Sequence, residues 1–137
     1  MNIGMIYSSE KKVIEKLARG LKRGLEEKGE KVTAYPDNEQ NFRGLASCKY
    51  LFVGTYKNSA FKPHTPHRLR DALARVPGIS GKRSIAFIPK SGMGERKALL
   101  AVMNDMEKQG CLLIDQHSFS SEKEAYEFGK TVSLKED

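Results

Sequence analysis

Serine and lysine side chains follow the first apolar segment of the chain, where they could bind an anion. This segment runs from Asn2 to Tyr7, and apolar residues at helical spacing follow from Glu10. The start of a helix presents unpaired backbone N–H groups and the positive end of the dipole, which favour a phosphate. The residues that could bind it are Ser8, Ser9, Lys11 and Lys12. The alternative is that Ser8 or Ser9 only caps the helix and the lysines are solvated.

A second group of candidate residues follows the apolar run Tyr50 to Val53. The connection Thr55 to Pro66 has 12 residues, and loops of that length in a compact domain are usually functional or mobile. It begins with Thr55, Tyr56, Lys57 and Asn58. Tyr56 could stack on a planar ring, or Tyr56 and Phe61 could simply cover the core.

A third loop, after the apolar run Arg83 to Ile88, contains two glycines that allow backbone to approach a ligand closely. Its residues are Pro89, Lys90, Ser91, Gly92, Met93 and Gly94. The alternative is an ordinary turn between a strand and a helix.

The remaining reactive side chains do not form a recognisable site. His64 and His67 are three positions apart, and no third metal ligand is identifiable, so no metal site is predicted. Cys48 and Cys111 are 63 positions apart, which excludes a CxxC redox motif and a cysteine-rich zinc site. Both are predicted to be free, buried thiols.

The spacing of apolar residues predicts alternating strands and helices. The predicted strands are Asn2–Tyr7, Lys31–Tyr35, Lys49–Gly54, Arg83–Ile88 and Cys111–Asp115. The predicted helices are Glu10–Gly29, with Val13 on its inward face, a segment around Leu69–Val76, Glu95–Gln109, and one that Ser121 and Glu124 begin as a capping box. The last residues, Lys135 to Asp137, are expected to fray.

This order predicts one α/β domain over residues 1–137: a doubly wound parallel sheet of five strands, order 2-1-3-4-5, with helices on both faces. Such sheets bind ligands outside the carboxyl ends of their strands, at the switch point between the first and third strands. The three loops described above lie at that edge.

Composition and charge limit the class of protein. No apolar run approaches the roughly 20 residues of a membrane span, and no secretory leader is visible, so a cytoplasmic location without a membrane partner is expected. The formal net charge of +7 favours an anionic ligand or partner, although a solvated basic surface would explain it equally well.

Four segments of the sequence resemble the flavodoxin family, and the resemblance spans nearly the whole chain. They are Ile3–Ser9 and Tyr50–Tyr56, which resemble its first and third strands with their loops, Gly81–Phe87, which resembles the entry to its fourth strand, and Glu127–Lys130, which resembles its closing helix. The family's first loop usually reads T/S-x-T-G-x-T and wraps the phosphate of FMN. Here that loop is shorter, lacks glycine and contains Glu10, Lys11 and Lys12.

The resemblance implies an FMN cofactor and an electron-transfer function. Family members usually hold the flavin ring between aromatic side chains, which correspond here to Tyr56 and to the non-aromatic Met93. They are typically acidic, whereas this chain is basic, so a redox partner with an acidic surface is expected. Two alternatives remain open: a module without FMN that binds an anionic partner such as nucleic acid, or a small FMN-dependent reductase.

Overall fold

We describe the fold from a computed structural model that places residues 1–135. The strands are β1 (Asn2–Tyr7), β2 (Lys31–Pro36), β3 (Tyr50–Gly54), β4 (Arg83–Pro89) and β5 (Leu112–Phe119). The helices are α1 (Lys12–Glu27), α2 (His67–Leu73), α3 (Glu95–Lys108) and α4 (Glu122–Thr131), with a 3₁₀ turn at Arg43–Leu45.

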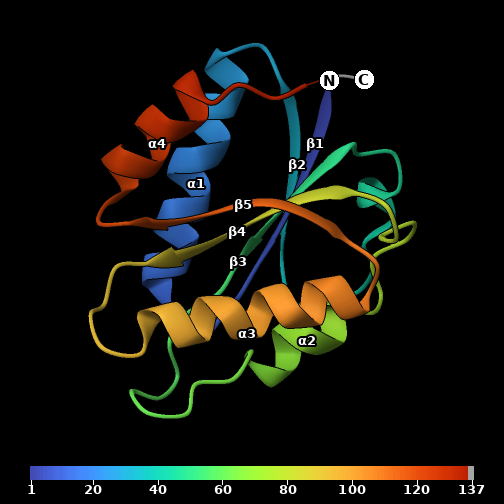
Figure 1. Ribbon diagram of the computed structural model, residues 1–137. Coiled ribbons are helices and arrows are strands. Elements are labelled where there is room, and N and C mark those ends of the chain that lie inside the picture. The colour runs from blue at the N-terminus through green and yellow to red at the C-terminus, as the bar shows by residue number, and fades with distance from the viewer. Residues whose placement is uncertain (136–137) are drawn as a thin grey trace.

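The strands form one parallel sheet with the order β2-β1-β3-β4-β5. Helices α1 and α4 cover one face, and α2 and α3 cover the other (Figure 1). The predicted α/β fold class and strand order are therefore confirmed.

β3 lies at the centre of the sheet, and all of its residues are buried. Leu51 and Val53 pack into the core under α2 and α3, whereas Tyr50 and Phe52 pack into the core under α1 and α4. Because both faces of β3 are covered, its sequence is continuously apolar and does not alternate with polar residues.

β5 extends further than the sequence predicts, to Phe119 and not to Asp115. Its middle residues are polar because β5 is an edge strand with much of its length in contact with solvent. Phe119 is nevertheless buried, with its ring centroid 5.4 Å from that of Phe128 in α4. Because exposed and buried residues do not follow a regular pattern along β5, its apolar residues show no clear period from which the end of the strand could be predicted.

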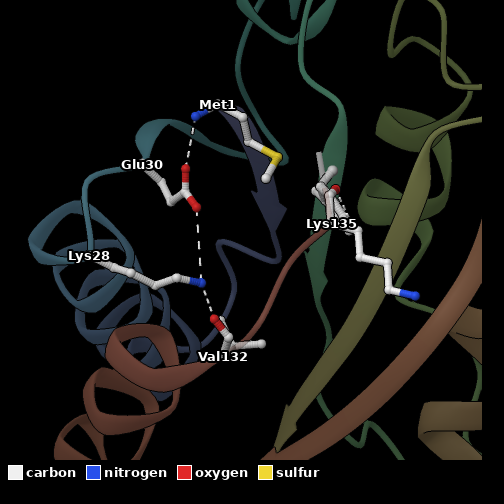
Figure 2. Close-up of polar contacts among 6 residues, drawn as sticks. Met1, Lys28, Glu30, Val132 and Lys135 are labelled. Atoms are coloured by element: carbon white, nitrogen blue, oxygen red, sulfur yellow. Dashed lines mark hydrogen bonds and ion pairs between the residues drawn. The ribbon is translucent and has the colours of Figure 1, made fainter. Parts of the chain in front are cut away.

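The end of the described chain returns to the amino edge of the sheet. The Tyr50 hydroxyl donates to the Lys135 carbonyl oxygen at 2.7 Å. Figure 2 shows a neighbouring set of contacts, in which Glu30 bridges the Met1 ammonium group and Lys28, and Lys28 donates to the Val132 carbonyl oxygen. Lys135 is thus anchored, and the other two residues expected to fray lie outside the described part.

Two further predictions can be compared with the structure. Cys48 and Cys111 are both free and buried, as predicted. Val13 was predicted to face the core, but it is 46% exposed in the first turn of α1, and Ile14 is the first buried residue of that helix. None of the helices within residues 1–135 combines the length and apolar character needed to cross a membrane.

Candidate functional site

The second and third predicted loops are joined at the carboxyl edge of the sheet, where β3 and β4 end (Figure 1). The Lys57 ammonium group donates to the carbonyl oxygens of Ser91 at 2.8 Å and Met93 at 2.6 Å. Gly94 has φ +87°, and a Cβ atom there would lie 2.6 Å from the Ala60 carbonyl oxygen. Lys57 therefore holds the two loops together, and only glycine fits at position 94.

A small pocket opens between the first loop and these two loops. Its volume is about 240 Å³, and it is lined by Lys11, Val13, Tyr56, Lys57, Pro89, Lys90 and Ser91. Small-molecule pockets usually measure about 300–1,000 Å³, so this one can accept part of a larger ligand. Apolar side chains from the first turn of α1 and from the third loop lie exposed at this edge: Val13 at 46% and Met93 at 69%.

Tyr56 supplies the aromatic surface of the pocket. The Lys11 ammonium group lies 5.6 Å from the centre of its ring, a cation–π contact. The Tyr56 hydroxyl donates to the Glu10 carboxylate at 3.1 Å. Partial burial and this hydrogen bond raise the pKa of Tyr56 above its usual value.

The first loop contains only four residues, Ser8 to Lys11, between β1 and α1. Lys11 occupies the N-cap position of α1 and makes no side-chain capping hydrogen bond. The alternative that Ser8 or Ser9 caps the helix is therefore wrong. Ser8 is completely buried, and its backbone N–H donates to the Gly54 carbonyl oxygen at 3.0 Å.

Ser9 is bound by a carboxylate of the chain itself. Its backbone N–H and its hydroxyl both donate to Oδ1 of Asp37, at 3.1 Å and 2.6 Å. Arg68 adds a longer contact from Nη1 to the Ser9 hydroxyl oxygen, at 3.4 Å. Asp37 is 1% exposed, and its backbone N–H donates to the Tyr7 carbonyl oxygen at 2.8 Å. An internal carboxylate thus accepts both hydrogen bonds that Ser9 donates.

Buried oxygen atoms without partners lie next to this contact. Tyr7 pairs with both Pro36 and Gly54 in the parallel register, so the residues that follow them form the next row across three adjacent strands. These are Asp37, Ser8 and Thr55, and each has a buried side-chain oxygen with no hydrogen-bond partner: Oδ2, Oγ and Oγ1, respectively.

The other predicted residues have different places. Lys12 is the exposed first residue of α1. The Asn58 side chain accepts a hydrogen bond from the His64 backbone N–H at 3.1 Å and so shapes its own loop. Gly92 has φ +78°, and its position lies in the exposed turn before α3. Among residues 1–135, no three His, Cys, Asp or Glu side chains gather as a metal site would require.

Sequence reasoning missed Asp37 and Glu10. Asp37 follows β2 directly, at the same sheet edge as Ser8, so its position after Pro36 was an available signal. Glu10 was noted as a departure from the family loop, but nothing local indicates that it binds the Tyr56 hydroxyl.

A larger pocket lies at the opposite, amino edge of the sheet. It measures about 470 Å³ and is lined by Cys48, Lys49, Ser80, Gly81, Lys82, Arg83, Leu112 and Lys135. Lys82 has a structural role there, because its ammonium group donates hydrogen bonds to the carbonyl oxygens of Ala46 and Cys48. Size alone therefore does not identify the functional site, and the switch point remains the better candidate.

Comparison with solved structures identifies the fold, although no family model and no curated protein matches the sequence. The two-electron reduced flavodoxin of Megasphaera elsdenii is 17% identical, with TM-score 0.74, and the match covers 93% of this chain and 96% of that one. A Streptococcus pneumoniae TIGR4 flavodoxin is 13% identical, with TM-score 0.73 and coverage of 95% and 96%. Oxidised flavodoxin 1 of Bacillus cereus is 14% identical, with TM-score 0.68 and coverage of 94% and 95%. At these identities the likeness establishes architecture: the protein has the flavodoxin fold.

Proposed function

We propose that this protein binds a flavin at the carboxyl edge between β1 and β3 and transfers electrons. The observation that carries the proposal is the pocket between Tyr56, Val13 and the third loop, because it lies at the switch point where flavodoxin-like sheets bind FMN. A bound flavin would supply the redox chemistry, and the chain would supply orientation and electrostatics.

The ring end of a flavin fits the residues present. Tyr56 offers an aromatic face whose hydroxyl is held by Glu10, and Val13 and Met93 offer exposed apolar side chains. Lys11 lies over the Tyr56 ring and must move aside for a flavin to stack there. Lys11 is exposed and has a flexible stem, so this displacement costs little.

The phosphate end of FMN fits poorly. The loop before α1 is short, and both donors of Ser9 are already bound to Asp37. The proposal therefore rests on recognition of the flavin ring.

An absorbance spectrum of the purified protein and a fluorescence titration with FMN and riboflavin test the proposal. We expect saturable quenching of flavin fluorescence and reversible reduction of the bound flavin. A colourless protein that quenches neither flavin would overturn it.

Positive charge at the same edge favours a second candidate, the binding of a polyanion. Lys12, Lys62, Lys90 and Arg96 are exposed there, and they also favour an acidic surface on any redox partner. Polyanion binding must weaken steeply with salt, because counterions are released on binding.

Labelled single-stranded DNA, titrated at two salt concentrations, distinguishes the two candidates. Salt-sensitive DNA binding that Lys62→Glu and Lys90→Glu weaken, without flavin quenching, would favour the second. Lys57 is unsuitable for this test because it joins the second and third loops.

A further inference from the structure

We propose that the Asp37 carboxylate occupies the anion position next to α1, so that the site selects an uncharged flavin such as riboflavin over FMN. This inference rests on the proposed function. It makes Asp37 a specificity-determining residue.

Ser9 donates two hydrogen bonds to Asp37 that could otherwise go to a phosphate. Phosphate groups often bind to backbone N–H groups at a helix N-terminus, and Ser9 offers a backbone N–H and a hydroxyl two residues before the N-cap Lys11 of α1. Here both donate to one oxygen of Asp37, at 3.1 Å and 2.6 Å. The carboxylate thus stands where a phosphate oxygen would stand.

The negative charge of Asp37 would repel a phosphate bound at this loop. Asp37 is 1% exposed, and like charges in a poorly hydrated site repel far more strongly than they do in water. A phosphate at this loop would meet that carboxylate at short range. A phosphate could not easily displace the Asp37 carboxylate from Ser9. The carboxylate is buried and would lose both of its hydrogen-bond donors, which costs free energy.

The second carboxylate oxygen indicates which ligand chemistry fits instead. Oδ2 of Asp37 is buried without a hydrogen-bond donor. A deprotonated phosphate offers no donor, whereas the hydroxyl groups of an uncharged sugar-alcohol chain do. Riboflavin and FMN share the ring that Tyr56 would bind and the ribityl chain; where FMN ends in a phosphate, riboflavin ends in a hydroxyl group that can donate a hydrogen bond.

The test compares dissociation constants for riboflavin and FMN, by flavin fluorescence quenching, in wild type and Asp37→Asn. We expect wild type to bind riboflavin at least as tightly as FMN. Asp37→Asn should shift the ratio toward FMN by about tenfold or more, the effect of removing one close like charge. Glu39→Gln is the matched control, because it removes a negative charge two positions away, and its ratio should stay within about twofold of wild type.

A second measurement is independent of flavin. Thermal unfolding in inorganic phosphate and in chloride, at equal ionic strength, should show phosphate stabilising Asp37→Asn but not wild type. Asp37→Ser is carried in parallel in case the asparagine variant folds poorly, and the same result is expected.

The outcomes separate this inference from the proposed function. If wild type prefers FMN and neither Asp37 variant changes the ratio, the inference fails while flavin binding stands. If no flavin binds but phosphate stabilises the Asp37 variants selectively, flavin binding fails while the anion position of Asp37 is supported. If no flavin binds and phosphate has no selective effect, both fail.

Discussion

At the scale of single residues, Tyr56 tests the flavin site most directly. We expect Tyr56→Ala to weaken flavin binding by roughly 2- to 12-fold, because an aromatic contact is worth about 0.5–1.5 kcal/mol beyond its buried area. Tyr56→Phe keeps the ring and loses only the hydrogen bond to Glu10, so it should bind almost normally. Fluorescence titration measures both.

A control variant separates the loss of a contact from a loss of folding. Tyr126→Ala removes a tyrosine from α4 that contacts Arg23 and Lys130, on a helix that contributes nothing to the pocket. It should leave flavin affinity unchanged. If it weakens binding as much as Tyr56→Ala does, Tyr56 has no place in the site.

The two thiols give a prediction about reactivity and pH. Burial raises the pKa of both Cys48 and Cys111 above the usual thiol value. Since only the thiolate reacts, a thiol reagent at pH 8 should modify the native protein slowly and the urea-unfolded protein quickly. Rapid modification of the native protein would contradict the burial of these residues.

The same groups make stability fall at alkaline pH. The folded pKa of each thiol lies above its unfolded value, so its contribution to stability is fully present below the unfolded pKa and is lost as the pH rises through the folded pKa. The pKa of Tyr7 is raised mainly by burial and acts in the same direction. Urea denaturation at pH 7 and pH 10 should show the lower free energy of unfolding at pH 10.

At the scale of elements, the backbones of α1 and α4 approach each other closely. A Cβ atom at Gly24 would collide with the Tyr126 carbonyl oxygen, and one at Gly129 would lie 2.6 Å from the Leu21 carbonyl oxygen. Glycine costs a helix about 1 kcal/mol relative to alanine, so the close approach of the two backbones explains these residues better than helix propensity does.

We therefore expect Gly24→Ala to destabilise the protein by about 1–3 kcal/mol, as overpacking usually does, despite the better helix propensity of alanine. Lys16→Ala, on the exposed side of α1, should change the free energy of unfolding by less than about 0.5 kcal/mol. Urea denaturation followed by circular dichroism measures both. A more stable Gly24→Ala protein would show that the helices are not held this close.

At the scale of the whole molecule, β3 lies between the two hydrophobic cores and contributes side chains to both of them. Phe52→Asp would place a charge in a completely buried position, and an unpaired buried charge costs several kcal/mol, much of a typical domain's stability. We expect this variant to show no cooperative unfolding transition.

Phe61→Asp is the matched control, since the same change is made at a side chain that is 75% exposed. Its thermal unfolding should match that of wild type. If Phe52→Asp also melts like wild type, the central placement of β3 is wrong.

The sequence by itself determined the order of the elements and the edge of the sheet at which the candidate loops lie. The continuous apolar run Tyr50–Val53 reflects burial on two faces, and the spacing in α1 reflects burial on one. Burial leaves a local pattern, and right-handed crossovers then restrict the topology to very few arrangements. Prediction was weaker where burial is mixed, as along β5 and at Val13.

Only the tertiary structure decided which polar groups meet. Ser9 and Asp37 are 28 positions apart, and Lys57 reaches carbonyl oxygens more than thirty positions away. Such contacts depend on strand register and on the length of the loops, neither of which produces a repeating pattern in sequence. The sequence therefore indicated an anion at the start of α1, whereas in the folded chain Ser9, in the loop before α1, binds the chain's own Asp37 carboxylate.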